Sequence, residues 1–261
     1  MDDWAARSAQ RQHDAYVRFF TPVTARFLPW ICHRLPADAK RVIDLGSGAG
    51  DLSALILADG RNCVAVDYSP LMSRACQQKG IPAAVADASR LPVADGAIDA
   101  AAAAFLLPHI PGLPDFLAEV RRIIRPGGAM IQLTWAGPEE SPFTGLASAL
   151  LAAVAPESVR QRLEIATCCT EPRYLTATAR DAGFADLELE TVRFDTRLES
   201  AGAWWHGMIG ASFGLSELIS MTEQDSRRLV RIRFLEAAEA FRDGDGLTVP
   251  VAAHLLRGTA R

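Results

Sequence analysis

The segment RVIDLGSGAG, at residues 41–50, constrains the fold of this chain more than any other stretch. A short apolar run ends at Asp44, and three glycines follow at Gly46, Gly48 and Gly50. Glycine adopts backbone conformations with positive φ at little steric cost, and it lets a ligand approach the main chain closely. The segment therefore predicts a buried strand that ends in a tight turn, and the turn leads into a helix.

Strand-like and helical segments alternate from residue 40 to residue 135. Short apolar runs predict strands at 41–46, 62–67, 82–87, 97–105 and 129–135, and amphipathic or capped segments predict helices at 51–60, 69–80 and 113–124. Alternation of this kind predicts a parallel sheet with helices on both faces. Pro126, Gly127 and Gly128 predict a break between the last helix and the last strand.

The second half of the chain is less regular. The sequence predicts an Ala-rich helical region at 138–171, a helix at 171–184, a strand at 185–196, two helices within 200–243 and a last strand at 247–258. The whole pattern predicts an α/β fold, a Rossmann-like doubly wound and mostly parallel seven-stranded sheet with helical cap insertions.

Composition excludes several classes of function. Hydrophobic residues make up 49% of the chain and charged residues 22%, as in globular proteins. The net charge of −4 favours neither nucleic acid nor an anionic membrane surface as a partner. We expect no membrane span, because no stretch approaches the ~20 apolar residues that a span needs. The amino terminus does not resemble a signal peptide, and five cysteines without metal spacing suggest reduced thiols in a cytoplasmic protein.

Two kinds of ligand could bind the glycine-rich turn. A dinucleotide site uses the pattern GxGxxG, whose third glycine would stand at the position of Asp51. An acid there would repel the pyrophosphate of a dinucleotide. The sequence thus disfavours a dinucleotide as the ligand of this turn. The remaining possibility is another ligand that carries a ribose and a charge.

Four segments together resemble the class I S-adenosylmethionine-dependent methyltransferases. Residues 44–50 resemble the first motif of that class, and VAVDYSP places an acid, Asp67, at the end of the second strand. The stretch from Asp87 to Asp99 and the helix and turn at 116–128 resemble the later motifs. The later part is also similar to the branch that contains quinone-biosynthesis methyltransferases.

The resemblance implies S-adenosylmethionine as the cofactor and assigns roles to residues of the first two motifs. Gly46, Ser47, Gly48 and Gly50 would bring the main chain and the amino end of the next helix to the cofactor carboxylate. Asp44 would interact with the cofactor ammonium group, directly or through water. Asp67 would accept hydrogen bonds from both ribose hydroxyls.

Further residues would surround the adenine and the methionine part of the cofactor. Asp87 would accept from the adenine amine and Ala88 would offer its N–H, although Asp87 could instead cap a helix. Ala103 and Phe105 would line the methionine part, although both could be ordinary core residues. Tyr68, Met72 and Leu91 would flank the adenine, and Tyr16 would touch the methionine end.

The resemblance also implies a division of the chain into functional regions. Residues 1–35 would form an N-terminal helical lid and residues 36–137 the S-adenosylmethionine-binding core. Residues 138–171 would form a cap insertion. Residues 172–261 would supply the C-terminal core strands, with a helical lid insertion at about 200–243.

Methyl transfer requires alignment of the acceptor and, for a phenol or carbon acid, removal of a proton. His109 follows the fourth strand and is a candidate general base, although it could instead pack or cap the next helix. His206 is a second candidate. No cluster has metal-ligand spacing, so no metal is expected. Four apolar residues suggest a hydrophobic acceptor pocket, although packing within the lid explains them equally well: Trp204, Trp205, Met208 and Phe213.

Three classes of function remain open from the sequence. The first is a methyltransferase that modifies oxygen, nitrogen or carbon of a small apolar or aromatic molecule. The second uses the same cofactor without methyl transfer, by cyclising its aminobutyryl chain to release methylthioadenosine or by catalysing a rearrangement. The third is a non-catalytic regulator that binds the cofactor. A homodimer is compatible with all three.

Overall fold

The structure is a computed structural model that describes residues 14–261, apart from the side chains at positions 158, 159, 162, 165, 166 and 213. The chain divides into two compact units. The core unit comprises Phe27–Trp135, Cys168–Val192 and Ala253–Arg261. The helical unit comprises Ala136–Thr167, Arg193–Ala252 and the described part of Met1–Arg26. Most of the predicted cofactor-binding core, 36–137, falls in the core unit.

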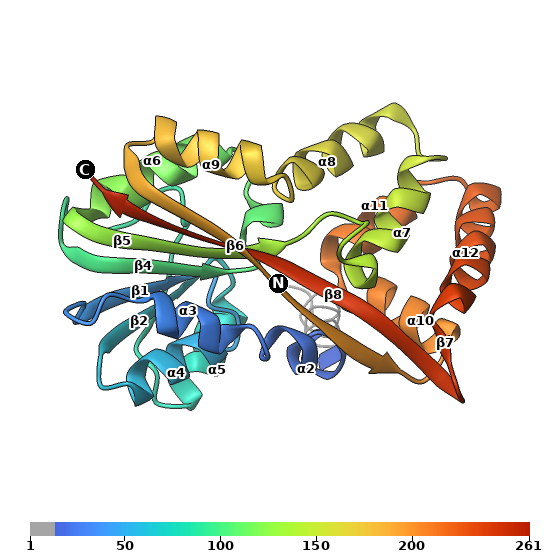
Figure 1. Ribbon diagram of the computed structural model, residues 1–261, viewed down its shortest axis with the longest axis horizontal. Helices are drawn as coiled ribbons and strands as arrows, with labels where there is room; N and C mark the ends of the chain where they lie inside the picture. The colour runs from blue at the N-terminus through green and yellow to red at the C-terminus, as the bar shows by residue number, and fades with distance from the viewer. Residues whose placement is uncertain (1–13) are drawn as a thin grey trace. The chain divides into compact units, whose positions relative to one another are not determined.

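One sheet contains all the named strands, in the order β3-β2-β1-β4-β5-β8-β6, with the two-residue strand β7 paired to β8 (Figure 1). Neighbouring strands from β3 to β5 are parallel, and β8 is antiparallel to β5. The strands are β1 (Arg41–Leu45), β2 (Asn62–Asp67), β3 (Ala83–Val85), β4 (Ile98–Ala104), β5 (Ile124–Trp135), β6 (Phe184–Leu198), β7 (Arg242–Asp243) and β8 (Gly246–Ala260).

The predicted fold class is confirmed, and the strand count differs by one. The sequence predicts seven strands, whereas the sheet has eight. The additional strand, β7, pairs with the beginning of β8, with Arg242 opposite Leu247. Two residues are too few to produce the alternating pattern from which a strand is predicted.

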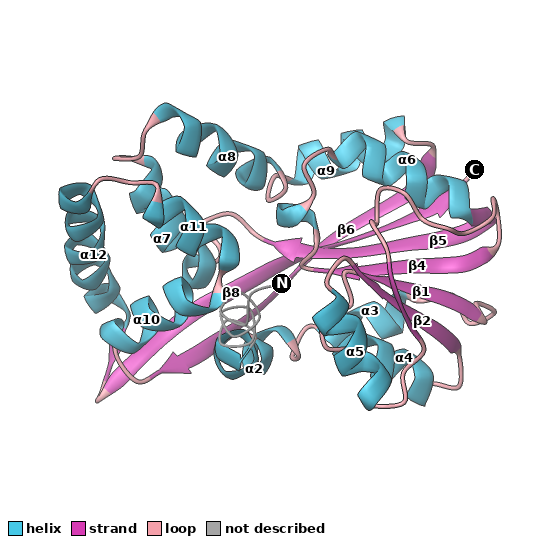
Figure 2. Ribbon diagram, turned by 180° about the vertical axis from the view of Figure 1, so that it is seen from behind, coloured by secondary structure: helices cyan, strands magenta, loops and turns pink. Residues whose placement is uncertain are grey.

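Helices cover both faces of the sheet in the core unit. In Figures 1 and 2, α6 and α9 lie over one face, and α3, α4 and α5 lie over the other. The helices of this unit are α3 (Leu28–Arg34), α4 (Asp51–Ala58), α5 (Pro70–Gln78), the 3₁₀ turn η1 (Leu107–His109), α6 (Leu113–Ile123) and α9 (Pro172–Asp181). The predicted helix positions in this unit agree with the structure to within a few residues.

The helical unit has more helices than the sequence predicts. Its helices are α2 (Thr21–Thr24), α7 (Pro142–Ala152), α8 (Glu157–Cys168, whose last residue belongs to the core unit), α10 (Ala201–Ala211), α11 (Phe213–Ser220), α12 (Gln224–Ala238) and the 3₁₀ turn η2 (Glu239–Phe241). The prediction of two helices within 200–243 is wrong, because Ser212 separates α10 from α11 and α12 follows as a third helix. The Ser212 hydroxyl accepts a hydrogen bond from Leu215 N at 3.3 Å and so caps α11.

The break predicted at Pro126–Gly128 lies inside a strand. β5 begins directly after α6, and its pairing with β4 shifts between Ile98 and Ala100. Gly127 has a φ of +76°, and a Cβ at Gly128 would lie 2.6 Å from Asp99 O. The two glycines therefore permit a bulge that keeps β5 against β4, and they do not end the strand.

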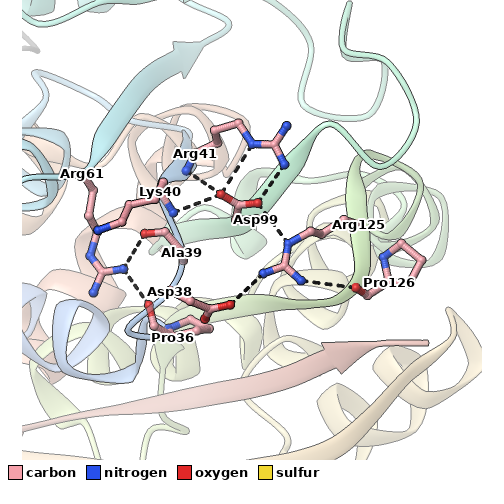
Figure 3. A network of polar contacts seen from close by, with 9 residues as sticks. All are labelled: Pro36, Asp38, Ala39, Lys40, Arg41, Arg61, Asp99, Arg125 and Pro126. Atoms are coloured by element: carbon pink, nitrogen blue, oxygen red, sulfur yellow. Dashed lines mark hydrogen bonds and ion pairs between the residues drawn. The ribbon is translucent and has the colours of Figure 1, made fainter.

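The amino ends of the central strands are tied together by Asp99 (Figure 3). Its carboxylate accepts hydrogen bonds from Lys40 N at 3.0 Å and Arg41 N at 2.8 Å. It also forms ion pairs with the Arg41 and Arg125 side chains at 2.8 and 3.0 Å. These donors, with those on the Arg41 side chain first, lower the pKa of Asp99. Asp99 belongs to a methyltransferase-like motif, yet here it joins β1, β4 and β5 at the edge opposite the glycine-rich turn.

Candidate functional site

The glycine-rich turn connects β1 to α4 at the carboxyl end of the sheet. Gly46, Gly48 and Gly50 have φ of +65°, +53° and +86°, values that other residues rarely adopt. A Cβ at Gly46 would lie 2.6 Å from Leu106 Cδ1, and one at Gly50 would lie 2.8 Å from Ile81 Cδ1. A Cβ at Gly48 would meet nothing within 4 Å. Gly46 and Gly50 thus allow close packing, whereas the space beside the Cα of Gly48 is open.

Asp67, at the end of β2, is bound to this turn. Its carboxylate accepts hydrogen bonds from Gly48 N at 2.9 Å and from Ser69 N at 2.8 Å. Burial raises the pKa of Asp67, and the two N–H donors oppose that rise. Because a carboxylate offers about four lone-pair sites, Asp67 keeps room for further donors. Ser47 supports the same junction, since its N–H donates to Val66 O at 3.1 Å.

Asp44 is the buried acid of the site. Its side chain is 1% exposed, and Oδ2 accepts a hydrogen bond from the Ser53 hydroxyl of α4 at 2.6 Å. Burial raises the pKa of Asp44 to about 7, and the negative charges of Asp67 and Asp51 act in the same direction. A cationic group beside Asp44 would relieve this unfavourable environment. The resemblance to the methyltransferases implies such a partner, the cofactor ammonium group.

The loop after β3 carries the third acid, Asp87. Asp87 is exposed, and its Oδ1 accepts a hydrogen bond from Ser89 N at 2.8 Å. The residues that follow form a turn closed by a bridge between Asp87 and Arg90. The alternative that Asp87 caps a helix is therefore wrong. Its role toward adenine, like that of Ala88, stays a prediction.

The remaining cofactor candidates occupy different environments. Tyr68 is 80% exposed, Met72 is partly buried in α5, and Ala103 is 2% exposed within β4. Phe105 has a left-handed backbone, with a φ of +58°, and its ring lies 4.1 Å from that of Trp135. Backbone strain of this kind costs of order 1–3 kcal/mol and is frequent at ligand sites. Their predicted contacts with the cofactor stay predictions.

His109 lies at the end of η1, close enough to Asp67 for their charges to interact. Surrounding protein atoms lower the pKa of His109 by desolvation, and the charge of Asp67 opposes this effect. The imidazole is therefore neutral near pH 7 and able to accept a proton. His206, the second candidate base, is exposed on α10 in the helical unit.

The residues predicted to bind the acceptor are mostly buried within the helical unit. Trp204 is fully buried, its indole N–H donates to Phe143 O at 3.0 Å, and its ring lies 4.9 Å from that of Phe234. Trp205 and Met208 are 7% and 3% exposed. The burial of Trp204 favours the packing alternative for that residue. The side chain of Phe213 lies outside the described residues.

Tyr16, predicted to touch the methionine end, also belongs to the helical unit and stacks on Phe20 with ring centroids 5.3 Å apart. The predicted N-terminal lid begins outside the described residues. The lid and cap roles of 1–35, 138–171 and 200–243 stay predictions.

Sequence reasoning missed a row of polar side chains on β5, β6 and β8, of which those on β5 and β8 are buried. Gln132 and Thr134 of β5 are 3% and 1% exposed, and Thr134 lies opposite His254 of β8. His254 is 1% exposed, and its Nδ1 lies 2.9 Å from the Thr191 hydroxyl of β6. The signal was present in the strand AMIQLTW, where two polar residues interrupt an apolar run at a spacing of two.

Among residues 14–261, no group of three or more histidine, cysteine, aspartate or glutamate side chains is arranged to hold a metal ion. No helix in that part of the chain is long and apolar enough to cross a membrane.

Residues 43–132, which contain β1 to β4 and most of β5, match the family described as "Methyltransferase domain". These residues therefore form a methyltransferase domain, in agreement with the resemblance to the class I S-adenosylmethionine-dependent methyltransferases. The matched residues include the glycine-rich turn, Asp67, Asp87 and His109.

Two curated proteins that match part of this chain are named demethylmenaquinone methyltransferase. The chain is 34% identical over 125 residues to a demethylmenaquinone methyltransferase of Mycobacterium sp. (strain KMS). The alignment covers 48% of this chain and 54% of that protein. It is 33% identical over 112 residues to a demethylmenaquinone methyltransferase of Thermus thermophilus. That alignment covers 40% of this chain and 51% of the relative. The chain thus spans about half the length of the curated relatives it matches.

Solved structures share the fold over a larger part of the chain. The YcgJ protein of Bacillus subtilis superimposes with a TM-score of 0.61 at 18% identity, over 90% of this chain and 98% of that one. A Haloferax volcanii methyltransferase, solved with the activator Trm112, superimposes with a TM-score of 0.59 at 18% identity. The superposition covers 100% of this chain and 98% of that one. At such identities, the likeness extends to the fold alone.

Proposed function

We propose that this protein transfers a methyl group from S-adenosylmethionine to a small apolar or aromatic molecule. One observation carries the proposal: the ends of β1 and β2 bring together a glycine turn with open space beside Gly48, a buried acid and a half-buried acid. Gly48 has nothing within 4 Å where a side chain would stand, and its N–H is bonded to Asp67. Names of the curated relatives suggest a quinone-like acceptor.

The residues present fit the cofactor. Asp44 is buried with a pKa raised to about 7, as expected of an acid that gains from a nearby ammonium group. Asp67 retains free lone pairs beside the open turn, in the position from which an acid can accept two hydroxyl donors. The bound cofactor supplies an activated methyl group on a sulfonium.

The chain itself supplies position and a base. Gly46 and Gly50 fix the turn by close packing, and Asp67 holds it through Gly48 N. Alignment of reactants alone can be worth an effective molarity of ~10⁵–10⁸ M. His109, neutral near pH 7 and near Asp67, would accept a proton from a phenol or carbon acid as the methyl is transferred.

We also propose a cytoplasmic location, which the five free cysteines support. The state of assembly stays a prediction; a homodimer is compatible with the sequence.

Product analysis tests the proposal. The protein is incubated with methyl-labelled S-adenosylmethionine and a panel of phenols and reduced quinones, with Asp67→Ala as the binding-deficient control. A labelled acceptor with an equal amount of S-adenosylhomocysteine supports methyl transfer. Methylthioadenosine would point instead to cyclisation of the cofactor. Cofactor binding without any product would indicate a regulator.

A further inference from the structure

Two polar side chains lie within an apolar part of the core unit. Gln132 and Thr134 alternate along β5 with Ile131 and Leu133, which are fully buried. Because side chains two residues apart share one face of a sheet, Gln132 and Thr134 point to the same side. Their neighbours across the strands are Ala103, Leu256 and His254. The two residues thus form a polar patch on a face that is otherwise mostly apolar.

These polar groups have unused hydrogen-bonding capacity. Gln132 Nε2 and Thr134 Oγ1 are buried, and neither has a hydrogen-bond partner among the described residues. Buried polar atoms in folded proteins are nearly always bonded, so an unbonded one is explained by a function or by ordered water. Simple packing gives no reason for an amide and a hydroxyl at these two positions, since leucine and valine would fill similar volumes.

The strand register places the patch near the glycine-rich turn. Leu45, the residue before Gly46, lies opposite Ala103 of β4, and Ala103 lies opposite Gln132. With about 4.8 Å between neighbouring strands, Gln132 is two strands or ~10 Å from the start of the turn. Thr134 is the penultimate residue of β5, at the carboxyl end where open α/β sheets bind their ligands.

We propose that Gln132 and Thr134 recognise the acceptor by donating hydrogen bonds to one of its oxygens. The inference rests on the proposed function and narrows its acceptor to an aromatic molecule with a phenol or carbonyl oxygen. Neither side chain carries a charge, so a phosphate or an ammonium group would be buried there without a counter-ion at high cost. A neutral oxygen suits an amide N–H and a hydroxyl.

A binding comparison tests this without depending on turnover. The probes are 1-naphthol and naphthalene, which differ by one hydroxyl, and binding is measured by calorimetry with S-adenosylhomocysteine present. The variants are Gln132→Met and Thr134→Val, which keep the volume and remove the polar groups. Thr178→Val is the matched control, because the buried Thr178 hydroxyl donates to Tyr174 O at 2.8 Å in α9.

We expect the wild type to bind 1-naphthol ~10-fold or more tightly than naphthalene, as one or two neutral hydrogen bonds allow. Each variant should reduce that ratio several-fold, the double variant should remove it, and Thr178→Val should leave it unchanged. Melting temperatures of the Gln132 and Thr134 variants should stay equal or rise, because no bond to a described residue is lost.

Two results would overturn the inference: a naphthol preference that survives in the double variant, or a wild type that binds both probes equally. A fall in melting temperature with an unchanged preference would show that the groups bond ordered water for stability alone. Failure of the proposed function is a separate result. It would appear as a wild type that forms no methylated product, whether or not 1-naphthol binding depends on Gln132 and Thr134.

Discussion

Replacement of Asp44 by asparagine should stabilise the protein while it weakens the cofactor site. The Asp44 carboxyl group is 1% exposed, and burial raises its pKa from 3.8 to about 7. The folded protein therefore binds the proton more tightly than the unfolded chain, so the free energy of unfolding falls as the pH rises from about 4 to about 7. An asparagine has the same shape, can still accept from Ser53, and does not titrate.

The magnitude follows from the size of the pKa difference. At ~1.4 kcal/mol per pKa unit, the shift amounts to about 4 kcal/mol over the whole range. Between pH 5 and pH 8, the wild type should lose roughly 2–3 kcal/mol of unfolding free energy relative to Asp44→Asn. The pKa of Asp67 is also raised, but Asp67 is present in the wild type and in Asp44→Asn. Its contribution to the pH dependence of stability therefore largely cancels in the comparison.

Cofactor binding should respond in the opposite sense. If the cofactor ammonium pairs with the ionised Asp44, the apparent Kd scales inversely with the ionised fraction. With a pKa of about 7, the wild type should bind S-adenosylhomocysteine roughly eightfold more weakly at pH 6 than at pH 7.5. Asp44→Asn should bind more weakly than the wild type at pH 7.5 and show a smaller dependence on pH.

Urea denaturation at pH 5 and pH 8 and calorimetric titration at pH 6 and pH 7.5 measure both effects. The stability argument would be refuted if the unfolding free energies of the wild type and of Asp44→Asn changed in parallel with pH. An Asp44→Asn variant with the wild-type Kd at pH 7.5 would refute the assignment of Asp44 to the cofactor ammonium, even if the stability prediction holds.

Three other substitutions test the remaining parts of the site and the fold. Asp67→Ala should raise the cofactor Kd ~10- to 100-fold, with the fold retained, and the exposed variant Asp225→Ala should leave the Kd unchanged in the same calorimetric assay. His109→Ala should lower kcat by ~10²-fold and remove the acidic limb of the pH–rate profile; a normal kcat with that limb intact would exclude the base role. Asp99→Ala should lower the free energy of unfolding by about 2–4 kcal/mol at pH 7, because it removes two main-chain bonds and two ion pairs. Since the folded pKa of Asp99 is depressed, this difference should shrink as the pH falls below about 4, and a constant difference would contradict it.

The sequence alone determined the strand–helix alternation of the core unit. Buried parallel strands need continuous apolar runs, and the helices between them need an apolar stripe, so both leave a local pattern that can be read without the structure. The glycine-rich turn and Asp67 were found in the same way. A turn with positive φ requires glycine, and the carboxyl end of a strand is defined by where the apolar run stops.

Contacts between distant residues were decided only by the tertiary structure. The break at Gly127 and Gly128 is a local signal for a turn, yet pairing with β4 keeps those residues in a strand. Asp99 stands within a methyltransferase-like motif, but Arg41 and Arg125 determine that it joins strands. The role of Asp99 cannot be deduced from its neighbours in the sequence, because its partners Arg41 and Arg125 are 58 and 26 residues away from it.

The chemical state of the site also depended on the three-dimensional arrangement. The sequence named Asp44, but the pKa of about 7 arises from burial, with Ser53 as its hydrogen-bond donor. The sequence showed Gln132 and Thr134 as two polar residues in an apolar strand, but only the register placed that strand two strands from the glycine-rich turn. Desolvation and cross-strand proximity are properties of the packed chain, and no pattern along the sequence encodes them directly.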